Sequence, residues 1–302
     1  MNETLSGEAL DGKSLHGKTL FITGATRGIG LAIALRAARD GANVVIAGRS
    51  IEHNPKLPGT IFTAAAEVEQ AGGVALPLRV DLRDEQQVRA ALAEASTRFG
   101  GLDIVVNNAA SMTLADTHHI DMARFDMMNQ VNVRGAFMVS KFALPLLEAS
   151  ANPHILMISP PLDLRETFFA AHTAFSLSKF GMSMMAMGLA AELRAKGVAV
   201  NTLWPRTFIS TPGIPHWPEG RDNLRFSRKP DIMADAAHVI LMQEAKAYTG
   251  KFLLDEAVLT EHGETEFEKY AIDDNDPVAS GFLHGPPRAA SARMPKPVAA
   301  AV

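Results

Sequence analysis

The stretch Thr23-Gly24-Ala25-Thr26-Arg27-Gly28-Ile29-Gly30 decides the fold of this chain. It follows an apolar run at 20–22 and precedes a helical pattern at 31–38. A glycine-rich turn between a strand and a helix is typical of phosphate-binding loops, because glycine lets the backbone bend sharply and approach a pyrophosphate closely. The first N–H groups of the helix then face the phosphates with partial positive charge. The pattern T-G-x-x-x-G-x-G therefore predicts a dinucleotide site, and an ordinary tight turn is the alternative interpretation.

Outward from this turn, apolar runs and helical patterns alternate along the chain. The apolar runs predict strands at 18–23, 44–47, 74–80, 102–106, 154–158, 198–203 and 252–254. The helical patterns predict helices at 29–39, 60–71, 84–99, 121–147 with a break near Asn132, 173–196 and 232–245. This alternation predicts the α/β class: a doubly wound, parallel sheet of Rossmann type in a single domain.

Three stretches fall outside the regular pattern. Residues 1–17 are polar and glycine-containing, and we expect a loose N-terminal leader before the Rossmann-type domain at 18–272. Residues 273–302 are rich in Asp, Pro, Ala and Arg, and we expect a flexible C-terminal tail because they cannot bury enough apolar area. The connection at 204–228 is long for an α/β unit, which suggests a lid over the substrate.

Composition excludes several classes of function. The formal net charge is −4, so no basic excess indicates binding to nucleic acid or to a membrane surface. The chain has no cysteine, which excludes disulfides, zinc–thiolate sites and a cysteine nucleophile. No metal site is predicted. No apolar run is long enough to span a bilayer, and the first residues do not resemble a signal peptide, so we expect a cytoplasmic protein with a small-molecule substrate.

Polar and glycine residues follow the predicted strands at one edge of the sheet, where ligands bind in this fold. These residues are Gly24, Arg49, Asp81, Asn108, Ser159 and Pro205. The second strand ends in Gly48 and Arg49 rather than in the carboxylate that holds the ribose of NAD. Because a 2′-phosphate prefers a guanidinium, Arg49 and Arg27 favour NADP(H) over NAD(H), unless Arg49 is only a solvated loop charge. Asp81 is expected to accept a hydrogen bond from the adenine amine, with structural capping as its alternative role.

Several motifs together resemble the short-chain dehydrogenase/reductase superfamily. They are the turn at 23–30, Asn107-Asn108-Ala109-Ala110, Asn132-Val133-Arg134-Gly135, Ser159 and Phe175-Ser176-Leu177-Ser178-Lys179, and the resemblance extends over about residues 15–260. The stretches 54–60, 159–161 and 248–252 resemble more narrowly the hydroxysteroid dehydrogenase-like branch. Some members of that branch carry a sterol-carrier domain, and we expect this chain to end too soon to include one.

The resemblance implies a catalytic tetrad and a set of cofactor contacts. It places Asn132 as the holder of a relay water, Ser159 on the substrate carbonyl oxygen, Phe175 at the position of the family's tyrosine, and Lys179 on the nicotinamide ribose. The cofactor-binding residues that it implies are Gly24, Ala25, Thr26, Arg27, Gly28, Ile29, Gly30, Arg49, Asp81, Leu82, Asn108, Ala109, Lys179 and Pro205. The helix that begins at Thr173 resembles the family's interface helix, which implies a homodimer or homotetramer.

One departure from the motif concerns the proton donor. The family motif is Tyr-x-x-x-Lys, but residue 175 is phenylalanine, which has no hydroxyl to donate or accept a proton. Loss of a general acid costs about 10²–10⁴ in rate, whereas hydride transfer depends on the nicotinamide. His172 lies three residues earlier and is a candidate replacement, although a loop histidine is its simpler interpretation. Tyr248 and Tyr270 lie at or beyond the last predicted strand and are not obvious substitutes.

Three hypotheses follow from this departure. In the first, the chain is an oxidoreductase that takes its proton from water, Ser159 or His172, or that acts on an activated double bond. In the second, it is an inactive nucleotide-binding sensor or subunit. In the third, it is an engineered Tyr-to-Phe form of an active reductase. The presence of Asn132, Ser159 and Lys179 favours the enzyme. A small to medium apolar carbonyl or acyl substrate is expected, because apolar side chains that can line a pocket, or pack in the core, follow the tetrad region: Met182, Met184, Met185, Phe208 and Trp217. Positive charges in the same region can instead meet an acidic or coenzyme-bound substrate, or can simply be solvated: Arg206, His216, Arg221 and Arg225.

Overall fold

Seven parallel strands form the central sheet of the computed structural model, which describes residues 14–170, 172–213 and 224–273. Their order is β3-β2-β1-β4-β5-β6-β7, so the chain starts in the middle and winds outward in both directions. The strands are β1 (Thr19–Thr23), β2 (Asn43–Gly48), β3 (Val74–Arg79), β4 (Ile104–Asn107), β5 (His154–Ile158), β6 (Ala199–Trp204) and β7 (Phe252–Leu254). The predicted α/β class with a doubly wound parallel sheet is confirmed.

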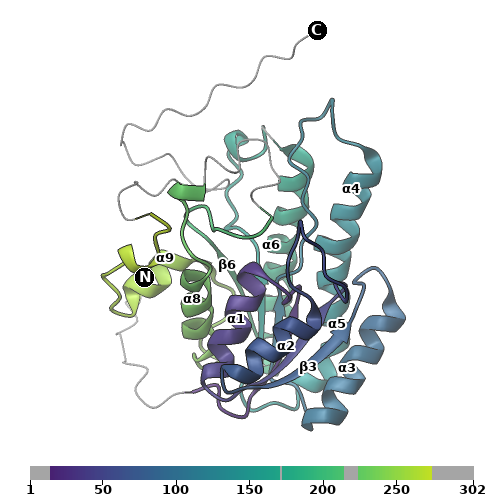
Figure 1. Cartoon of the computed structure of the whole chain (residues 1–302), viewed down its shortest axis with the longest axis vertical. Coiled ribbons are helices and arrows are strands. Elements are labelled where there is room, and N and C mark those ends of the chain that lie inside the picture. Colours follow the sequence, from purple (N-terminus) through teal and green to yellow (C-terminus); the bar gives the residue numbers. More distant parts are fainter. Residues whose placement is uncertain (1–13, 171, 214–223, 274–302) are drawn as a thin grey trace.

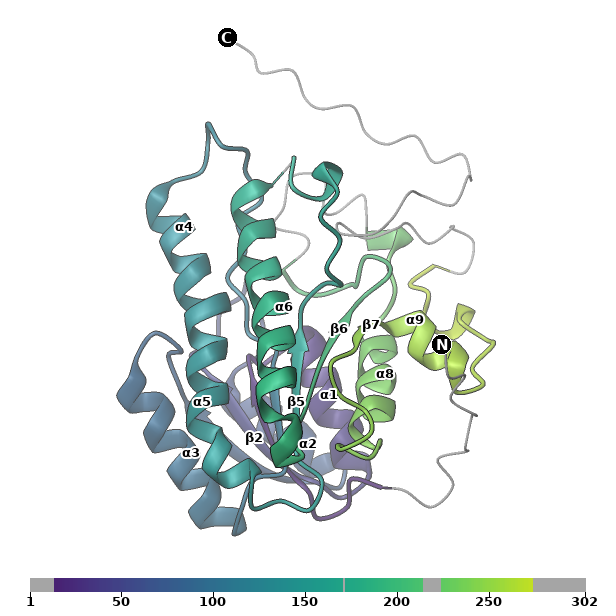
Figure 2. The ribbon, with the colours of Figure 1, turned by 180° about the vertical axis from the view of Figure 1, so that it is seen from behind.

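Helices cover both faces of this sheet (Figures 1 and 2). One layer contains α1 (Gly28–Arg39), α2 (Ile61–Gln70) and α8 (Asp231–Leu241), and the other contains α3 (Glu85–Phe99), α5 (Ala136–Leu147) and α6 (Thr173–Leu193). Because side chains alternate along a strand, Ile22 belongs to the buried apolar cluster with α1 and α8, whereas Phe21 belongs to the cluster with α3, α5 and α6.

The predicted break in the helical region 121–147 is a π-helix at Asn129–Gly135. It joins α4 (Met122–Met128) to α5, and Figure 2 shows the three segments as one continuous column beside α6. Asn132 lies in the middle of the π-helix. Single turns of π-helix are frequent at functional sites, because they change the direction of side chains within an otherwise regular helix.

Several element ends differ from the predictions. The helix predicted at 173–196 stops at Leu193 and continues as a 3-10 turn at Arg194–Lys196, and the helix predicted at 232–245 stops at Leu241. The short helix α9 (Asp255–Glu261) was not predicted, because seven residues are too few to show a helical period. The start of α3 was predicted through its cap, and Asp84 does accept hydrogen bonds from the backbone N–H groups of Gln86 and Gln87.

Parts of the predicted leader, connection and tail lie outside the described residues, namely 1–13, 214–223 and 274–302. Across the described ranges, no helix has the length and apolar character needed to cross a membrane.

Candidate active site

The glycine turn closes directly onto the segment that follows β4. A Cβ at Gly24 would lie 2.8 Å from the Cα of Ala109, and a Cβ at Gly30 would lie 2.4 Å from Nδ2 of Asn108. Gly28 has a φ of +56°, a conformation that favours glycine. Helix α1 begins here with Arg27 as its N-cap residue and with no side-chain cap hydrogen bond. The first N–H groups of α1 therefore keep their capacity to bind an anion.

Thr23 joins this turn to the end of β4, a role that its place in the motif did not predict. Its hydroxyl donates to the carbonyl of Val106 (3.2 Å) and accepts from the backbone N–H groups of Asn108 (3.0 Å) and Ala109 (3.1 Å). The side chain of Asn108 donates in turn to the carbonyls of Thr23 (2.9 Å) and Gly24 (3.2 Å). The predicted contacts Gly24, Asn108 and Ala109 thus form one hydrogen-bonded unit with Thr23 at its centre. The signal for Thr23 in the sequence is a threonine at the end of a predicted strand.

The two arginines expected near the adenosine end have different surroundings. Arg27 Nε donates to the carbonyl of Pro58 (2.8 Å), and its Nη2 donates to the carbonyl of Gly59 (2.7 Å) and to the hydroxyl of Ser50 (2.9 Å). Its guanidinium therefore fastens the loop after β2 over the glycine turn. Arg49 keeps 60% of its side chain exposed, and its Nη1 lies 3.9 Å from Oδ2 of Asp81.

Asp81 follows β3 and is paired within its own loop. Both of its carboxylate oxygens accept from the guanidinium of Arg83, with Oδ2 2.5 Å from Nη2. This pair lowers the pKa of Asp81, which keeps the carboxylate charged at neutral pH. Leu82, the next residue, is buried beneath it.

Ser159 and Lys179 meet at the end of β5. Ser159 is fully buried, and its Oγ has no hydrogen-bond partner among the described residues. Lys179 comes from α6, and its Nζ donates to the carbonyl of Ile158 (2.8 Å), the residue directly before Ser159. Burial lowers the pKa of Lys179 to about 7. The Nζ also lies 5.4 Å from the centroid of the Trp204 ring, which ends β6 just before Pro205.

The side chain of Asn132 connects three segments around this centre. Its Oδ1 accepts from the backbone N–H of Ser111 (2.7 Å), and its Nδ2 donates to the carbonyl of Ser111 (2.9 Å) and to the hydroxyl of Ser178 (2.9 Å). Ser178 Oγ donates to the carbonyl of Phe175 (2.8 Å). The amide thus ties the π-helix to α6 and to the segment after β4. Ser178 was not predicted, because a serine inside a helix carries no distinctive pattern.

The ring of Phe175 lies in a small apolar cluster. Phe175 is buried together with Met128 and Ala174, and three partly buried side chains pack against them: Leu114, Ile120 and Phe125. The ring is held by apolar contacts to α4 and to the segment before it, and it brings no polar group to the site. The position predicted for a proton donor therefore has a purely apolar side chain.

The other candidate proton donors have distinct placements. His172 is the N-cap residue of α6, and burial lowers the pKa of its imidazole, which reduces its protonated fraction at neutral pH. Tyr270 donates its hydroxyl to Asp235 (2.7 Å), and burial raises the pKa of Tyr248 to about 12. Both tyrosines belong to the core cluster that contains α8.

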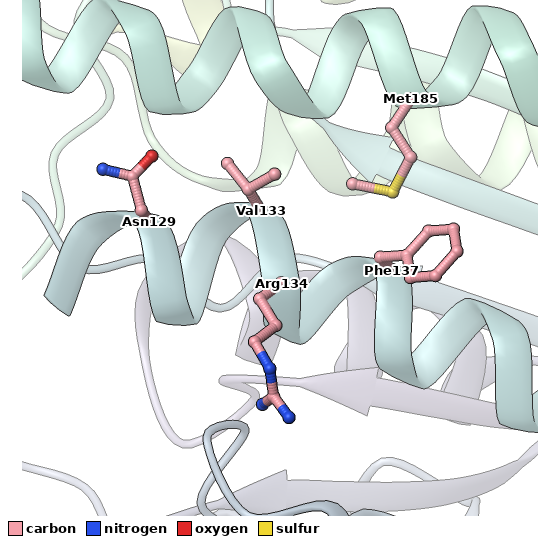
Figure 3. Close-up of a pocket in the computed structure, with 5 residues that line it drawn as sticks. All are labelled: Asn129, Val133, Arg134, Phe137 and Met185. Carbon is pink, nitrogen blue, oxygen red and sulfur yellow. The ribbon is translucent and has the colours of Figure 1, made fainter. Parts of the chain in front are cut away.

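The methionines of α6 do not share one pocket. Met182 is fully buried, with its sulfur 3.7 Å from Nζ of Lys179, whereas Met184 is half exposed. Met185 instead lines an apolar hollow between α6 and the column of the π-helix and α5, with Asn129, Val133, Arg134 and Phe137 (Figure 3). Trp217, His216 and Arg221 lie outside the described residues.

Comparisons with known proteins agree with this geometry. Residues 18–218 match the family described as short chain dehydrogenase. The hydroxysteroid dehydrogenase-like protein 2 of Danio rerio is 48% identical over 272 residues, an alignment that covers 90% of this chain but only 65% of that protein. The chain therefore spans less than two thirds of the length of this relative.

Two solved structures show the same fold. A putative dehydrogenase from Xanthomonas campestris is 50% identical, with a TM-score of 0.86 and coverage of 91% of this chain and 99% of that one. A metagenomic short-chain oxidoreductase in complex with NADP is 25% identical, with a TM-score of 0.65 and coverage of 80% and 97%. The chain belongs to the short-chain dehydrogenase/reductase family, whose members are NAD(P)-dependent oxidoreductases.

Proposed function

We propose that this chain binds NADP(H) and catalyses hydride transfer to or from the carbonyl or hydroxyl carbon, or an activated double bond, of a small to medium apolar substrate. One observation carries the proposal: the hydroxyl of Ser159 is buried, has no hydrogen-bond partner in the part of the chain that the structure describes, and follows the residue whose carbonyl anchors the Lys179 ammonium. A buried hydroxyl without a partner is costly, and a substrate oxygen at this point would satisfy it.

The residues of the glycine turn fit a dinucleotide. The backbone at Gly24 and Gly30 is packed so closely against 108–109 that a Cβ at either position would collide with Ala109 or Asn108, so the shape of the turn requires glycine. The start of α1 presents N–H groups and the positive end of the helix dipole to the same space. When bound, the nicotinamide supplies the hydride, and the protein supplies position and charge.

Ser159 and Lys179 have complementary roles in this proposal. Ser159 Oγ donates a hydrogen bond to the substrate oxygen. Lys179 donates to the carbonyl of Ile158 and to the sulfur of Met182, and its third N–H would bind a ribose hydroxyl. Its pKa of about 7 means that the charge of Lys179 changes within the physiological range.

Residue 175 is a phenylalanine and has no proton to donate, so the proton for the substrate oxygen must come from another group. Water, Ser159 and His172 remain the candidates, and the lowered pKa of His172 leaves less of its imidazolium form at neutral pH. A missing general acid costs about 10²–10⁴ in rate, but positioning and the cofactor still supply most of the acceleration. We therefore expect slow rather than absent turnover.

The preference for NADP(H) rests on Arg49. No carboxylate stands at the end of β2, where Gly48 is buried, and the exposed guanidinium of Arg49 follows it. A relative of known structure was solved with NADP. Arg27 supports the site indirectly, by holding the loop 50–59 in place.

Substitution of Arg49 tests the cofactor preference. We expect Arg49→Ala to weaken NADPH by about tenfold, because a charge-assisted hydrogen bond to the 2′-phosphate is lost, and to leave NADH unchanged. Arg89→Ala is the matched control, since Arg89 is 56% exposed on α3. Binding of both nucleotides is measured by quenching of protein fluorescence. Equal effects of Arg49→Ala on NADPH and NADH would show that Arg49 does not bind the 2′-phosphate.

A second candidate function is nucleotide binding without turnover. The observation that favours it is the apolar packing of Phe175 against Met128 and Ala174, which leaves no donor at that position. A panel of carbonyl substrates at saturating NADPH separates the two functions. Measurable oxidation of NADPH with any substrate supports the enzyme, whereas tight binding with no oxidation across the panel supports a sensor or subunit.

We also propose that the chain forms a homodimer or homotetramer through α5 and α6. The hollow of Figure 3 lies between α6 and the column of the π-helix and α5. Large apolar side chains are exposed on α5 and α6: Phe137, which lines the hollow, and Leu177, Met184 and Met187. Apolar surface gathered on two long neighbouring helices is typical of an interface. A second copy of this chain would bury it by twofold symmetry.

A further inference from the structure

A buried carboxylate lies beside the site without a role in the proposed chemistry. Asp255 follows β7 directly and is the first residue of α9, and its side chain has no exposed surface. Strand β7 pairs with β6 such that Leu254 is level with Trp204. Asp255 is therefore level with Pro205, at the carboxyl edge of the sheet where Ser159 and Lys179 lie.

One oxygen of Asp255 fixes the backbone that leaves β6. Its Oδ1 accepts hydrogen bonds from the N–H of Arg206 (2.9 Å) and from the N–H of Glu256 (2.7 Å). The first bond is made 49 residues away in sequence, to the residue that follows Pro205. The second is a local bond at the start of α9. The same oxygen thus couples the position of the turn after β6 to the start of the last helix.

The neighbouring acid extends this contact to a second stretch of chain. Glu256 Oε2 accepts from Nη1 of Arg228 (3.0 Å) and lies 3.6 Å from Nε of Arg206. The backbone N–H of Arg228 donates to the carbonyl of Phe208 (2.9 Å), and Ser210 donates to the carbonyl of Arg228 (2.8 Å). The stretches 206–210 and 224–228 are therefore held together at the start of α9.

The arrangement is poorly suited to stability alone. Asp255 Oδ2 is buried and has no hydrogen-bond partner among the described residues, and the same is true of Nε of Arg228. Burial raises the pKa of Asp255 to about 6. A buried carboxylate with one oxygen that has no partner among the described residues is costly to folding. What Oδ1 of Asp255 provides in return is a fixed position for the backbone N–H of Arg206.

We propose that Asp255 is a positioning residue, whose Oδ1 holds the backbone after Pro205 where it closes the nicotinamide end of the cofactor site. This inference rests on the proposed function. In that function Ser159 would hold the substrate oxygen and Lys179 the nicotinamide ribose, and Lys179 Nζ lies 5.4 Å from the centroid of the Trp204 ring, which precedes Pro205. A turn that drifts after Trp204 would loosen this end and leave the distant glycine turn unaffected.

Two ligands separate this role from a general structural role. NADPH uses both ends of the site, whereas adenosine 2′,5′-bisphosphate occupies only the adenosine end. Both are titrated by calorimetry into the full chain, its Asp255→Ala variant and its Asp255→Ser variant. The serine variant keeps a polar side chain, but its hydroxyl is one bond shorter than the arm that carries Oδ1 and does not reach the N–H of Arg206.

We expect both variants to bind NADPH about tenfold more weakly, because one buried hydrogen bond and the position that it sets are lost, and to bind the bisphosphate as the wild type does. Asp255→Asn retains Oδ1 and is expected to keep most of the NADPH affinity. Unchanged NADPH binding by Asp255→Ser, or equal weakening of both ligands, would overturn the inference. So would loss of folding in both variants, since it would show a role in folding alone. A wild-type chain that binds neither ligand would overturn the proposed function and this inference with it.

Discussion

Phe175 and Lys179 lie one turn apart on α6 and have opposite surroundings. The ring of Phe175 is packed among apolar side chains next to α4, whereas the ammonium of Lys179 is buried against the carbonyl of Ile158. The helix therefore retains a buried cation with a pKa of about 7 and brings no hydroxyl from residue 175. In the proposed function, cofactor binding survives and proton delivery is weakened.

The first prediction concerns this missing hydroxyl. We expect Phe175→Tyr to raise kcat by about 10²–10⁴ on the carbonyl compound that is reduced fastest, because it supplies a general acid beside Lys179. The dissociation constant for NADPH should stay the same. Steady-state kinetics and fluorescence titration measure the two quantities, with Phe175→Leu as the apolar control. If the tyrosine variant is no faster than the leucine variant, residue 175 is not the acid position.

A second residue predicts how stability depends on pH. His154 begins β5, is buried, and bonds through Nε2 to the carbonyl of Gln243 (3.1 Å). Burial lowers the pKa of His154 from 6.5 to about 4. The unfolded chain therefore binds this proton at a higher pH than the folded chain does. The contribution of neutral His154 to the free energy of unfolding is fully present above pH 6.5 and is lost as the pH falls toward 4, by about 3 kcal/mol at most.

The measurement is urea unfolding at several pH values between 4 and 6.5. The free energy of unfolding should decline less steeply with falling pH in His154→Gln than in the wild type. The slope should change by an amount that corresponds to at most one bound proton. The exposed His118 provides the control variant His118→Gln, which should leave the slope as it is. A wild-type slope retained in His154→Gln would show that other groups cause the acid sensitivity.

At the scale of elements, the glycine turn and the start of α1 yield the third prediction. A Cβ on residue 30 would lie 2.4 Å from Nδ2 of Asn108 and 2.7 Å from the carbonyl oxygen of Gly24. One of these contacts is with backbone, so the turn must open. We expect Gly30→Ala to weaken NADPH binding by at least about tenfold and to lower the unfolding free energy by about 1–3 kcal/mol.

The matched control is Gly101→Ala. Gly101 follows α3, and a Cβ there would meet nothing within 4 Å. This variant should bind NADPH like the wild type. Unimpaired binding by Gly30→Ala would mean that the nucleotide does not use the turn.

The elements themselves were largely predictable from the sequence, since the strands are short apolar runs and Asp84 marks the start of α3. The π-helix was predicted only as a break near Asn132, because a change in the backbone hydrogen bonds of a helix has no residue pattern of its own. The hydrogen bonds of the Asn132 side chain to Ser111 and Ser178 join segments that are far apart in the sequence, so spacing does not indicate them. The engagement of Arg27 with the carbonyls of Pro58 and Gly59 depends on where the loop folds back, which sequence does not indicate. Asp255 was overlooked for the same reason, as its partner Arg206 is far away along the chain.

At the scale of the whole molecule, one charged network ties the layer of α1 and α8 to the first described residues. Asp40 accepts from Arg36 Nη1 (2.9 Å) and bonds to His238 Nε2 (2.7 Å), and it also accepts from the N–H of Leu15. These contacts lower the pKa of Asp40 to about 2. On the opposite layer, large apolar side chains of α5 and α6 are exposed.

The fourth prediction tests whether a second copy covers that surface. Phe137 on α5 is 47% exposed and lines the hollow of Figure 3, while Phe62 on α2 is 56% exposed on the other layer. We expect Phe137→Glu to shift the chain from a dimer or tetramer toward the monomer, because a charge would be buried in the interface, and Phe62→Glu to leave the assembly intact. Light scattering after size exclusion gives the mass. A monomeric wild type, or equal masses for all three chains, would remove the proposed interface.

The most direct test of the central proposal is a crystal structure of the chain with NADPH. We predict that the pyrophosphate lies against the N–H groups at the start of α1, with the nicotinamide between Ser159 and Lys179 and the 2′-phosphate near Arg49. A nucleotide bound elsewhere, or a glycine turn closed by its own neighbours with no pyrophosphate against it, would contradict the proposal.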